Sequence, residues 1–128
     1  MRDSLFHIDQ RLWISDLNIY TYPDIMVTPT PLELQTGRKD KIVNPYLIAE
    51  FLSKSTQNYD RGEKFFAYRS LPNFQEYLII AQYELDLEHC VKTNVNQWLL
   101  TESEDVNATI SLNTLEFKLN ISEIYETI

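Results

Sequence analysis

Two acidic residues stand inside apolar stretches of this sequence, and they are the first candidates for chemistry. Asp24 follows Pro23 in the run NIYTYPDIMV, and Glu50 lies within YLIAEFLS. An ionised carboxylate among apolar residues is costly unless it is paired, hydrogen-bonded or bound to a cation. Either residue could simply be a strand residue that faces water. If the two converge, they could instead hold one hard cation such as Mg²⁺, which prefers oxygen ligands.

A metal ion held in this way would support phosphodiester hydrolysis, because it polarises a phosphoryl oxygen and supplies a hydroxide nucleophile. Lys64 is the third candidate, in YDRGEKFFAYR, where it shares a helix face with Tyr68 at a spacing of four. Its ammonium could stabilise charge on the phosphate or help to activate water. The alternative is an exposed helix lysine, and the run Arg38, Lys39 and Lys41 could likewise be solvated loop charges.

Other reactive residue types are scarce. Cys90 is the only cysteine, so an internal disulfide and a thiolate metal cluster are excluded, and packing is its expected role. His7 and His89 lie far apart in sequence, which leaves little for a histidine-rich zinc site or a catalytic triad. With Gly37 and Gly62 as the only glycines, a glycine-rich phosphate loop is excluded. Any metal must therefore be held by oxygen.

Length and charge limit the class of protein further. A chain of 128 residues with 44% hydrophobic residues is long enough for one domain and too short for two ordinary ones. The net charge of −8 argues against general nucleic-acid binding, since phosphate contacts need Lys and Arg. Residues 1–69 hold nine basic and nine acidic residues, whereas residues 70–128 hold two basic and ten acidic ones. Any DNA should therefore be approached by the first half.

The sequence carries no sign of membrane insertion or secretion. No apolar run approaches the roughly 18 to 20 residues needed to span a bilayer. The first ten residues lack the apolar centre of a secretion signal. We therefore expect a cytoplasmic protein with no membrane partner.

Extended stretches are predicted along most of the chain from the spacing of apolar and β-branched residues. One of them, residues 18–27, should run through Pro23 and continue past Asp24. Residues 28–41 should form an exposed loop, since they are rich in proline and charge. Residues 74–93 should fold into two antiparallel strands that turn near residues 81–83. The other strand candidates are residues 11–14, 44–53, 97–101, 109–112 and 115–119.

Two helices are predicted. One covers residues 60–71, with Asn58 or Asp60 as its cap, and ends before the next proline. The other covers residues 121–128, with Ser122 as a possible cap. This order of elements predicts an α+β fold, in which a helix flanks a mixed β-sheet that ends in a C-terminal antiparallel strand run. The centre of the core is expected where the first helix lies on the sheet, formed by Leu47, Ile48, Phe65, Leu71, Leu78 and Ile80.

Four stretches of the sequence resemble the Uma2 family of endonucleases, within the PD-(D/E)xK or restriction endonuclease-like superfamily. They follow the family's order as PDIMV, YLIAEFLSKST, YDRGEKFFAY and FQEYLII, and a weaker likeness extends to the C-terminus. The match of EFLSKST followed by YDRGEKFFAY is the most specific part. The resemblance implies a restriction endonuclease-like sheet and a metal-dependent DNA endonuclease that uses a metal-activated water. It implies Mg²⁺ or Mn²⁺ as cofactor and DNA as partner.

The resemblance also implies roles for particular residues. The family's metal-binding aspartate falls on Asp24 and its acidic strand residue on Glu50, with the carbonyl of Phe51 as a further metal ligand. The superfamily's lysine falls on Leu52, which cannot serve, so the helix would supply it as Lys64. We expect the two carboxylates to point into one cavity from adjacent strand positions. Their mutual repulsion should raise the pKa of at least one of them.

Two departures from the family support a second hypothesis. Family members usually carry an additional N-terminal helix and strands, so residues 1–128 are interpreted as a single shortened domain. Ala81 stands where relatives often have aspartate. The alternative is therefore a catalytically weak or inactive remnant that acts as an interaction or dimerisation module. A homodimer formed through an uncovered sheet face is expected, and an unrelated small binding domain is the third possibility.

Overall fold

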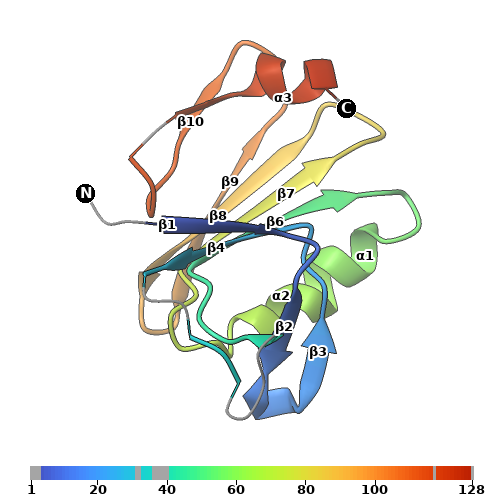
Figure 1. Ribbon diagram of the computed structural model, residues 1–128. Helices are drawn as coiled ribbons and strands as arrows, with labels where there is room; N and C mark the ends of the chain where they lie inside the picture. Colours follow the sequence, from blue (N-terminus) through green and yellow to red (C-terminus); the bar gives the residue numbers. More distant parts are fainter. Residues whose placement is uncertain (1–3, 31–32, 36–40, 117, 128) are drawn as a thin grey trace.

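A six-stranded mixed β-sheet forms the centre of the molecule (Figure 1). Its strand order is β1-β4-β6-β7-β8-β9, and all neighbouring pairs are antiparallel except β6 and β7. The strands are β1 (Ser4–Ile8), β4 (Ile25–Pro29), β6 (Leu47–Leu52), β7 (Glu76–Ala81), β8 (Leu87–Asn94) and β9 (Gln97–Ser103). The computed structural model describes residues 4–30, 33–35, 41–116 and 118–127.

A helix connects the parallel strands β6 and β7 and crosses one face of the sheet (Figure 1). It runs through α1 (Gln57–Tyr59), a π-helical turn η2 (Asp60–Lys64) and α2 (Phe65–Tyr68). It begins three residues before the predicted start, so Asn58 and Asp60 lie inside the helix and do not cap it. Its end before the next proline is confirmed. Among the described residues, no helix is long and apolar enough to cross a membrane.

Two smaller sheets lie on opposite sides of the central one (Figure 1). On the side of the helix, β2 (Arg11–Ile14) pairs with β3 (Ile19–Thr21) and β5 (Lys41–Ile42), and the turn η1 (Ser15–Leu17) joins β2 to β3. On the other side, β10 (Thr109–Ser111) pairs with β11 (Lys118–Asn120), and α3 (Ile121–Thr127) follows. The predicted cap Ser122 therefore lies inside α3.

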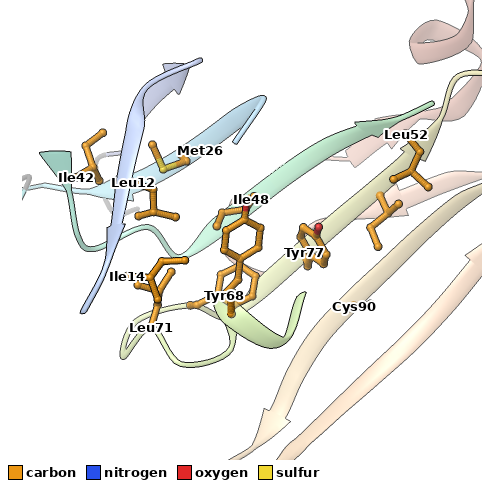
Figure 2. Packing of buried hydrophobic residues seen from close by; sticks show 13 residues of the cluster. Leu12, Ile14, Met26, Ile42, Ile48, Leu52, Tyr68, Leu71, Tyr77 and Cys90 are labelled. Carbon is orange, nitrogen blue, oxygen red and sulfur yellow. The ribbon is translucent and has the colours of Figure 1, made fainter. Parts of the chain in front are cut away.

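One hydrophobic cluster fills the space between the sheet and the helix. Ile48 of β6 and Tyr77 of β7 meet Tyr68 of α2 and Leu71, which follows the helix (Figure 2). Phe65 packs against the edge of this cluster. The predicted core residues Ile48, Phe65 and Leu71 are thus confirmed under the helix.

The opposite face of the sheet packs against β10, β11 and α3. Leu78 and Ile80 of β7 are buried there with Ile110 and Ile121, and Leu47 belongs to a third small cluster. The prediction that Leu47, Leu78 and Ile80 lie under the helix is wrong, because successive strand residues point to opposite faces. They are buried all the same, since both faces of these strands are covered.

The stretch 18–27 is not one strand, contrary to the prediction. It divides into β3, which belongs to the small sheet, and β4, which belongs to the central sheet. Pro23 has no N–H to give to a ladder. The Asp24 N–H binds a side chain instead of a neighbouring strand. The chain therefore changes sheets at residues 22–24.

Several other boundaries differ from the predictions. The predicted loop 28–41 begins inside β4 and ends in β5, and its residues 31–32 and 36–40 lie outside the described part of the chain. The predicted strand 115–119 is ordered as a strand from Lys118, and residue 117 is also outside the description. Strand β1 was not predicted. Its side chains are half or fully exposed, so the strand has no buried face. Its sequence therefore lacks the alternation of buried apolar and exposed polar residues that would have marked it as a strand.

Glu76 ties the β10–β11 loop to the central sheet. Its fully buried carboxylate accepts hydrogen bonds from His89, from the backbone N–H groups of Asn113 and Thr114 at 2.8 Å each, and from the Thr114 hydroxyl at 2.7 Å. Burial would raise the pKa of Glu76, but the hydrogen bonds from His89, Asn113 and Thr114 outweigh it and lower this pKa below its ordinary value. The ionised carboxylate is therefore the form that the fold stabilises.

Replacing Glu76 with Gln should lower the free energy of unfolding by about 1 to 3 kcal/mol at neutral pH, because buried donors lose their acceptor. A folded-state pKa below the ordinary 4.5 means that this contribution is present above pH 4.5 and is lost as the pH falls through the folded value. Urea unfolding at neutral and acidic pH measures both effects, with the exposed Glu116→Gln as control. A loss of stability that did not shrink in acid would contradict this role.

Replacing Ile80 or Ile48 with Ala should cost about 2 to 5 kcal/mol of unfolding free energy. Ile48 is fully buried in the packed helix-side cluster, whereas Ile80 borders a cavity of about 440 Å³. Fewer contacts are lost beside existing open space, so Ile80→Ala should fall nearer the lower end. Chemical denaturation of the two variants tests this order. Parent-like thermal unfolding of Ile80→Ala would show that Ile80 is not packed in the cluster with Ile110 and Ile121.

Candidate active site

Asp24 and Glu50 lie side by side, where β4 begins and β6 nears its end. The antiparallel register pairs Ile25 with Ala49, which places Asp24, the residue before β4, opposite Glu50. The Asp24 N–H donates to Glu50 Oε1 at 3.0 Å, and the Phe51 N–H donates to Asp24 Oδ2 at 2.7 Å. Each carboxylate is thus bound by backbone from the other segment. These two bonds hold the acids together.

The helix supplies two more partners for Glu50. The second carboxylate oxygen, Oε2, accepts from Lys64 Nζ at 3.1 Å and from the Tyr68 hydroxyl at 2.7 Å. Lys64 and Tyr68 are four residues apart, so both face the sheet. The structure therefore brings Asp24, Glu50 and Lys64 into one hydrogen-bonded group. Tyr68 was noted in the sequence only for its spacing from Lys64, and its contact with Glu50 was missed.

Burial governs the protonation of Glu50. Its side chain is 1% exposed, and this burial raises the pKa of Glu50 above its ordinary value. The charge of Lys64 and the hydrogen bonds from Tyr68 and the Asp24 backbone lower that pKa in part. The raised pKa was predicted, but its main cause is loss of water and not repulsion by Asp24. Burial and the Glu50 charge also raise the pKa of Tyr68, which keeps its hydroxyl a neutral donor.

The oxygens at this site suit a hard divalent cation. Asp24 is partly exposed, and among the described residues no donor binds its Oδ1. Glu50 offers a second carboxylate one strand away. A set of carboxylate oxygens, with the Asp24 oxygen accessible from solvent, matches the preference of Mg²⁺ and Mn²⁺. The Phe51 N–H is committed to Asp24, and the role of the Phe51 carbonyl stays a prediction.

A second acidic group lies further along the same sheet face. Ligand oxygens of Asp86, Glu102 and Glu104 all lie within 4.8 Å of one another, and we call these residues the acidic cluster. The register passes from Glu50 through Ile79 of β7 and Glu88 of β8 to Glu102 of β9, while Asp86 directly precedes β8 and Glu104 directly follows β9. Three strand spacings of about 4.8 Å separate Glu50 from Glu102, roughly 14 Å in all. The acidic cluster therefore cannot share one ion with Asp24 and Glu50.

Arg61 covers one side of the acidic cluster. It donates to Asp86 Oδ2 at 3.1 Å and also pairs with Glu88, the neighbour of Glu102 in the ladder. Arg61 lies three residues before Lys64, so one helix face places one cation over Glu50 and another over β8. Close carboxylates also raise the pKa of Glu102, chiefly through a hydrogen bond with Asp86.

The cysteine and the histidines serve elsewhere. Burial raises the pKa of the Cys90 thiol to about 11, as expected for a packing role. His89 binds Glu76, and His7 Nε2 lies 3.0 Å from the Thr28 hydroxyl. None of the three belongs to the group around Glu50.

The fold of this chain is similar to that of a solved nuclease-like structure. A solved structure described as "a putative nuclease belonging to DUF820", from Anabaena variabilis, matches 98% of this chain and 69% of its own, with a TM-score of 0.73 and 14% identity. The chain thus shares the fold of this solved structure, and the predicted α+β fold with a mixed sheet and C-terminal antiparallel strands is confirmed.

The family follows from the sequence comparisons. The model of the Uma2 family, described as "putative restriction endonuclease", matches residues 2–122, and the chain belongs to this family. Uncharacterized protein sll1609 of Synechocystis sp. is 40% identical over 112 residues, which are 88% of this chain and 63% of that protein. Uncharacterized protein slr1290 of the same organism is 29% identical over 91% of this chain and 60% of its own length. The chain spans about three fifths of these curated relatives.

Replacing Lys64 with Met should lower the free energy of unfolding by about 1 to 3 kcal/mol, because the buried Glu50 carboxylate loses its cation. The double variant Glu50→Gln, Lys64→Met should recover most of this loss. Since the folded-state pKa of Glu50 is raised, Glu50→Gln alone should be at least as stable as the parent at pH 7, and the difference should shrink as Glu50 protonates in acid.

Urea unfolding of the parent and the three variants measures these differences, with the exposed Lys118→Met as the control for removing a lysine. Equal destabilisation by Lys64→Met in the presence and absence of Glu50 would show that the two side chains do not interact in solution.

Proposed function

We propose that this chain is a metal-dependent endonuclease domain that hydrolyses phosphodiester bonds in DNA by a metal-activated water. The observation that carries this proposal is the group formed by Asp24, Glu50 and Lys64, in which two carboxylates and an ammonium meet where the start of β4, β6 and the helix come together. The family and the fold support it. Asp24 is partly exposed, and no donor among the described residues binds its Oδ1, so this oxygen is accessible to a cation.

In this proposal Asp24 and Glu50 hold Mg²⁺ or Mn²⁺, with the Phe51 carbonyl as a further ligand. The ion, when bound, supplies Lewis-acid activation of the phosphoryl oxygen and of the attacking water. Lys64 stabilises the charge that develops on the phosphate, since its ammonium lies beside the carboxylate that holds the ion. Tyr68 remains neutral and keeps Glu50 oriented through its hydroxyl.

The direct test is nicking of supercoiled plasmid with Mg²⁺ or Mn²⁺. Asp24→Ala and Asp24→Asn should reduce the cleavage rate by about 100-fold or more, because a ligand is removed and its oriented charge lost. Asp16→Ala, an exposed aspartate on η1, is the matched control. Cleavage that persisted in both Asp24 variants would come from another site or a contaminant and would end the proposal.

Metal affinity supplies a second readout in the same test. Binding of Mn²⁺ requires ionised Glu50, whose pKa is raised above 4.5. Calorimetric affinity should therefore fall as the pH decreases through that raised pKa, and Glu50→Gln should abolish the pH-dependent part.

One observation favours a second candidate function, an interaction or dimerisation module. The sheet face opposite the helix carries the apolar cavity of about 440 Å³, lined by residues that include Phe6, Val27 and Leu115. Phe6 and Ile8 on the edge strand β1 are 61% and 70% exposed. A second copy could cover this surface. Light scattering of the parent and Phe6→Asp, run beside the nicking assay, separates the candidates, because a monomer with Asp24-dependent cleavage excludes the module.

A further inference from the structure

A groove of about 450 Å³ opens beside Lys64, between β3 and the helix. Lys64 belongs both to the wall of this groove and to the candidate active site, since its Nζ binds Glu50. A ligand in the groove would therefore lie next to the group proposed to act on the phosphate. The volume falls within the range of small-molecule sites, about 300 to 1,000 Å³. The groove is lined by Leu17 and Ile19 on one side and by helix residues that include Tyr59, Gly62, Lys64 and Phe66 on the other.

The lining of the groove suits a nucleobase better than a phosphate. Tyr59 is 46% exposed and Phe66 is 63% exposed, so two aromatic rings on the helix are open to a ligand. Lys64 Nζ lies 5.5 Å from the centre of the Tyr59 ring. Aromatic rings beside a cation are the surface on which proteins stack unpaired bases. The groove also contains Glu63, whose charge offsets that of Lys64.

Gly62 lines an open part of the groove. A Cβ placed on it would have no atom within 4 Å, and its backbone is helical. Glycine weakens a helix, and here no left-handed conformation or close contact requires it. Gly62 therefore contributes open space to a groove whose lining also includes Tyr59 and Phe66.

The opposite side of Lys64 is closed to nucleic acid by charge. Arg61 is engaged by Asp86 and Glu88, and the acidic cluster continues onto β9. A phosphate chain crossing β8 and β9 would meet carboxylates at close range. A strand that reaches Lys64 from the side of β3, where the groove lies, avoids these carboxylates.

We propose that this groove binds an unstacked nucleobase next to the phosphate to be cut, so that single-stranded or locally unpaired DNA is the preferred substrate. This rests on the proposed nuclease function and specifies its substrate. Bases in an intact duplex are stacked on one another, and presenting one to the groove requires unpairing it.

Binding is tested with a short single strand that carries the fluorescent base 2-aminopurine, in Ca²⁺, with cutting checked on a gel. We expect the emission to be quenched on binding and a duplex of the same sequence to bind about tenfold more weakly. Gly62→Phe fills the groove and Phe66→Ala removes a stacking ring. Each should weaken single-strand binding about tenfold and remove the quenching.

Two matched controls should bind like the parent. Gly62→Ala leaves the groove open, and Val95→Ala removes an apolar side chain that is 76% exposed at the β8–β9 turn. Circular dichroism checks the fold, and Phe66→Ala retains the test if Gly62→Phe does not fold. Parent-like binding by Phe66→Ala, or equal binding of duplex and single strand without quenching, would overturn the proposal.

The outcome is separable from that of the nuclease proposal. A parent that quenches the probe but never cuts supports the groove and rejects the nuclease. Asp24-dependent cutting without quenching supports the nuclease and rejects the groove as a nucleobase site. A parent oligomer that Phe66→Ala dissociates would assign the groove to a second copy and overturn the nucleobase.

Discussion

The buried carboxylate of Glu50 is the group on which the rest of the arrangement depends. It is 1% exposed, and an ion in this position is tolerated only with partners on both oxygens. The Asp24 N–H serves one oxygen, while Lys64 and Tyr68 serve the other. These partners come from the start of β4 and from the helix. The site therefore forms only when both segments have docked on β6, so its geometry is coupled to the fold itself.

This requirement explains two local departures from regular structure. The chain passes from the small sheet to the central sheet at Pro23. At this point the Asp24 N–H donates a hydrogen bond to the Glu50 carboxylate and not to the backbone of a neighbouring strand. The helix must place Lys64 over Glu50 and Arg61 over β8, and it does so through a π-helical turn that contains both residues. Such turns occur often at functional sites. Both departures from regular secondary structure thus occur at residues that contact Glu50 or the neighbouring carboxylates.

Local patterns in the sequence were enough to predict the strand of Glu50 and the helix of Lys64, because an apolar run broken by one acid marks Glu50 and helical spacing joins Lys64 to Tyr68. The facing of Leu78 and Ile80 could not be predicted, since a strand buried on both sides has no alternation to mark its faces. The break at Asp24 depends on a partner 26 residues away. The pairing of Arg61 with Asp86 is equally remote in sequence.

Under the proposed function, the charge distribution would couple the binding of the metal ion to the binding of DNA. The first half of the chain was expected to meet DNA, yet its two helix cations already bind carboxylates, Lys64 with Glu50 and Arg61 with Glu88 and Asp86. While these ion pairs are formed, the carboxylates partly neutralise both cations and weaken their electrostatic attraction to a phosphate. A divalent ion on Asp24 and Glu50 would neutralise the local negative charge and weaken the hold on Lys64. Metal and DNA should therefore favour each other's binding, and by linkage the effect must be equal in both directions.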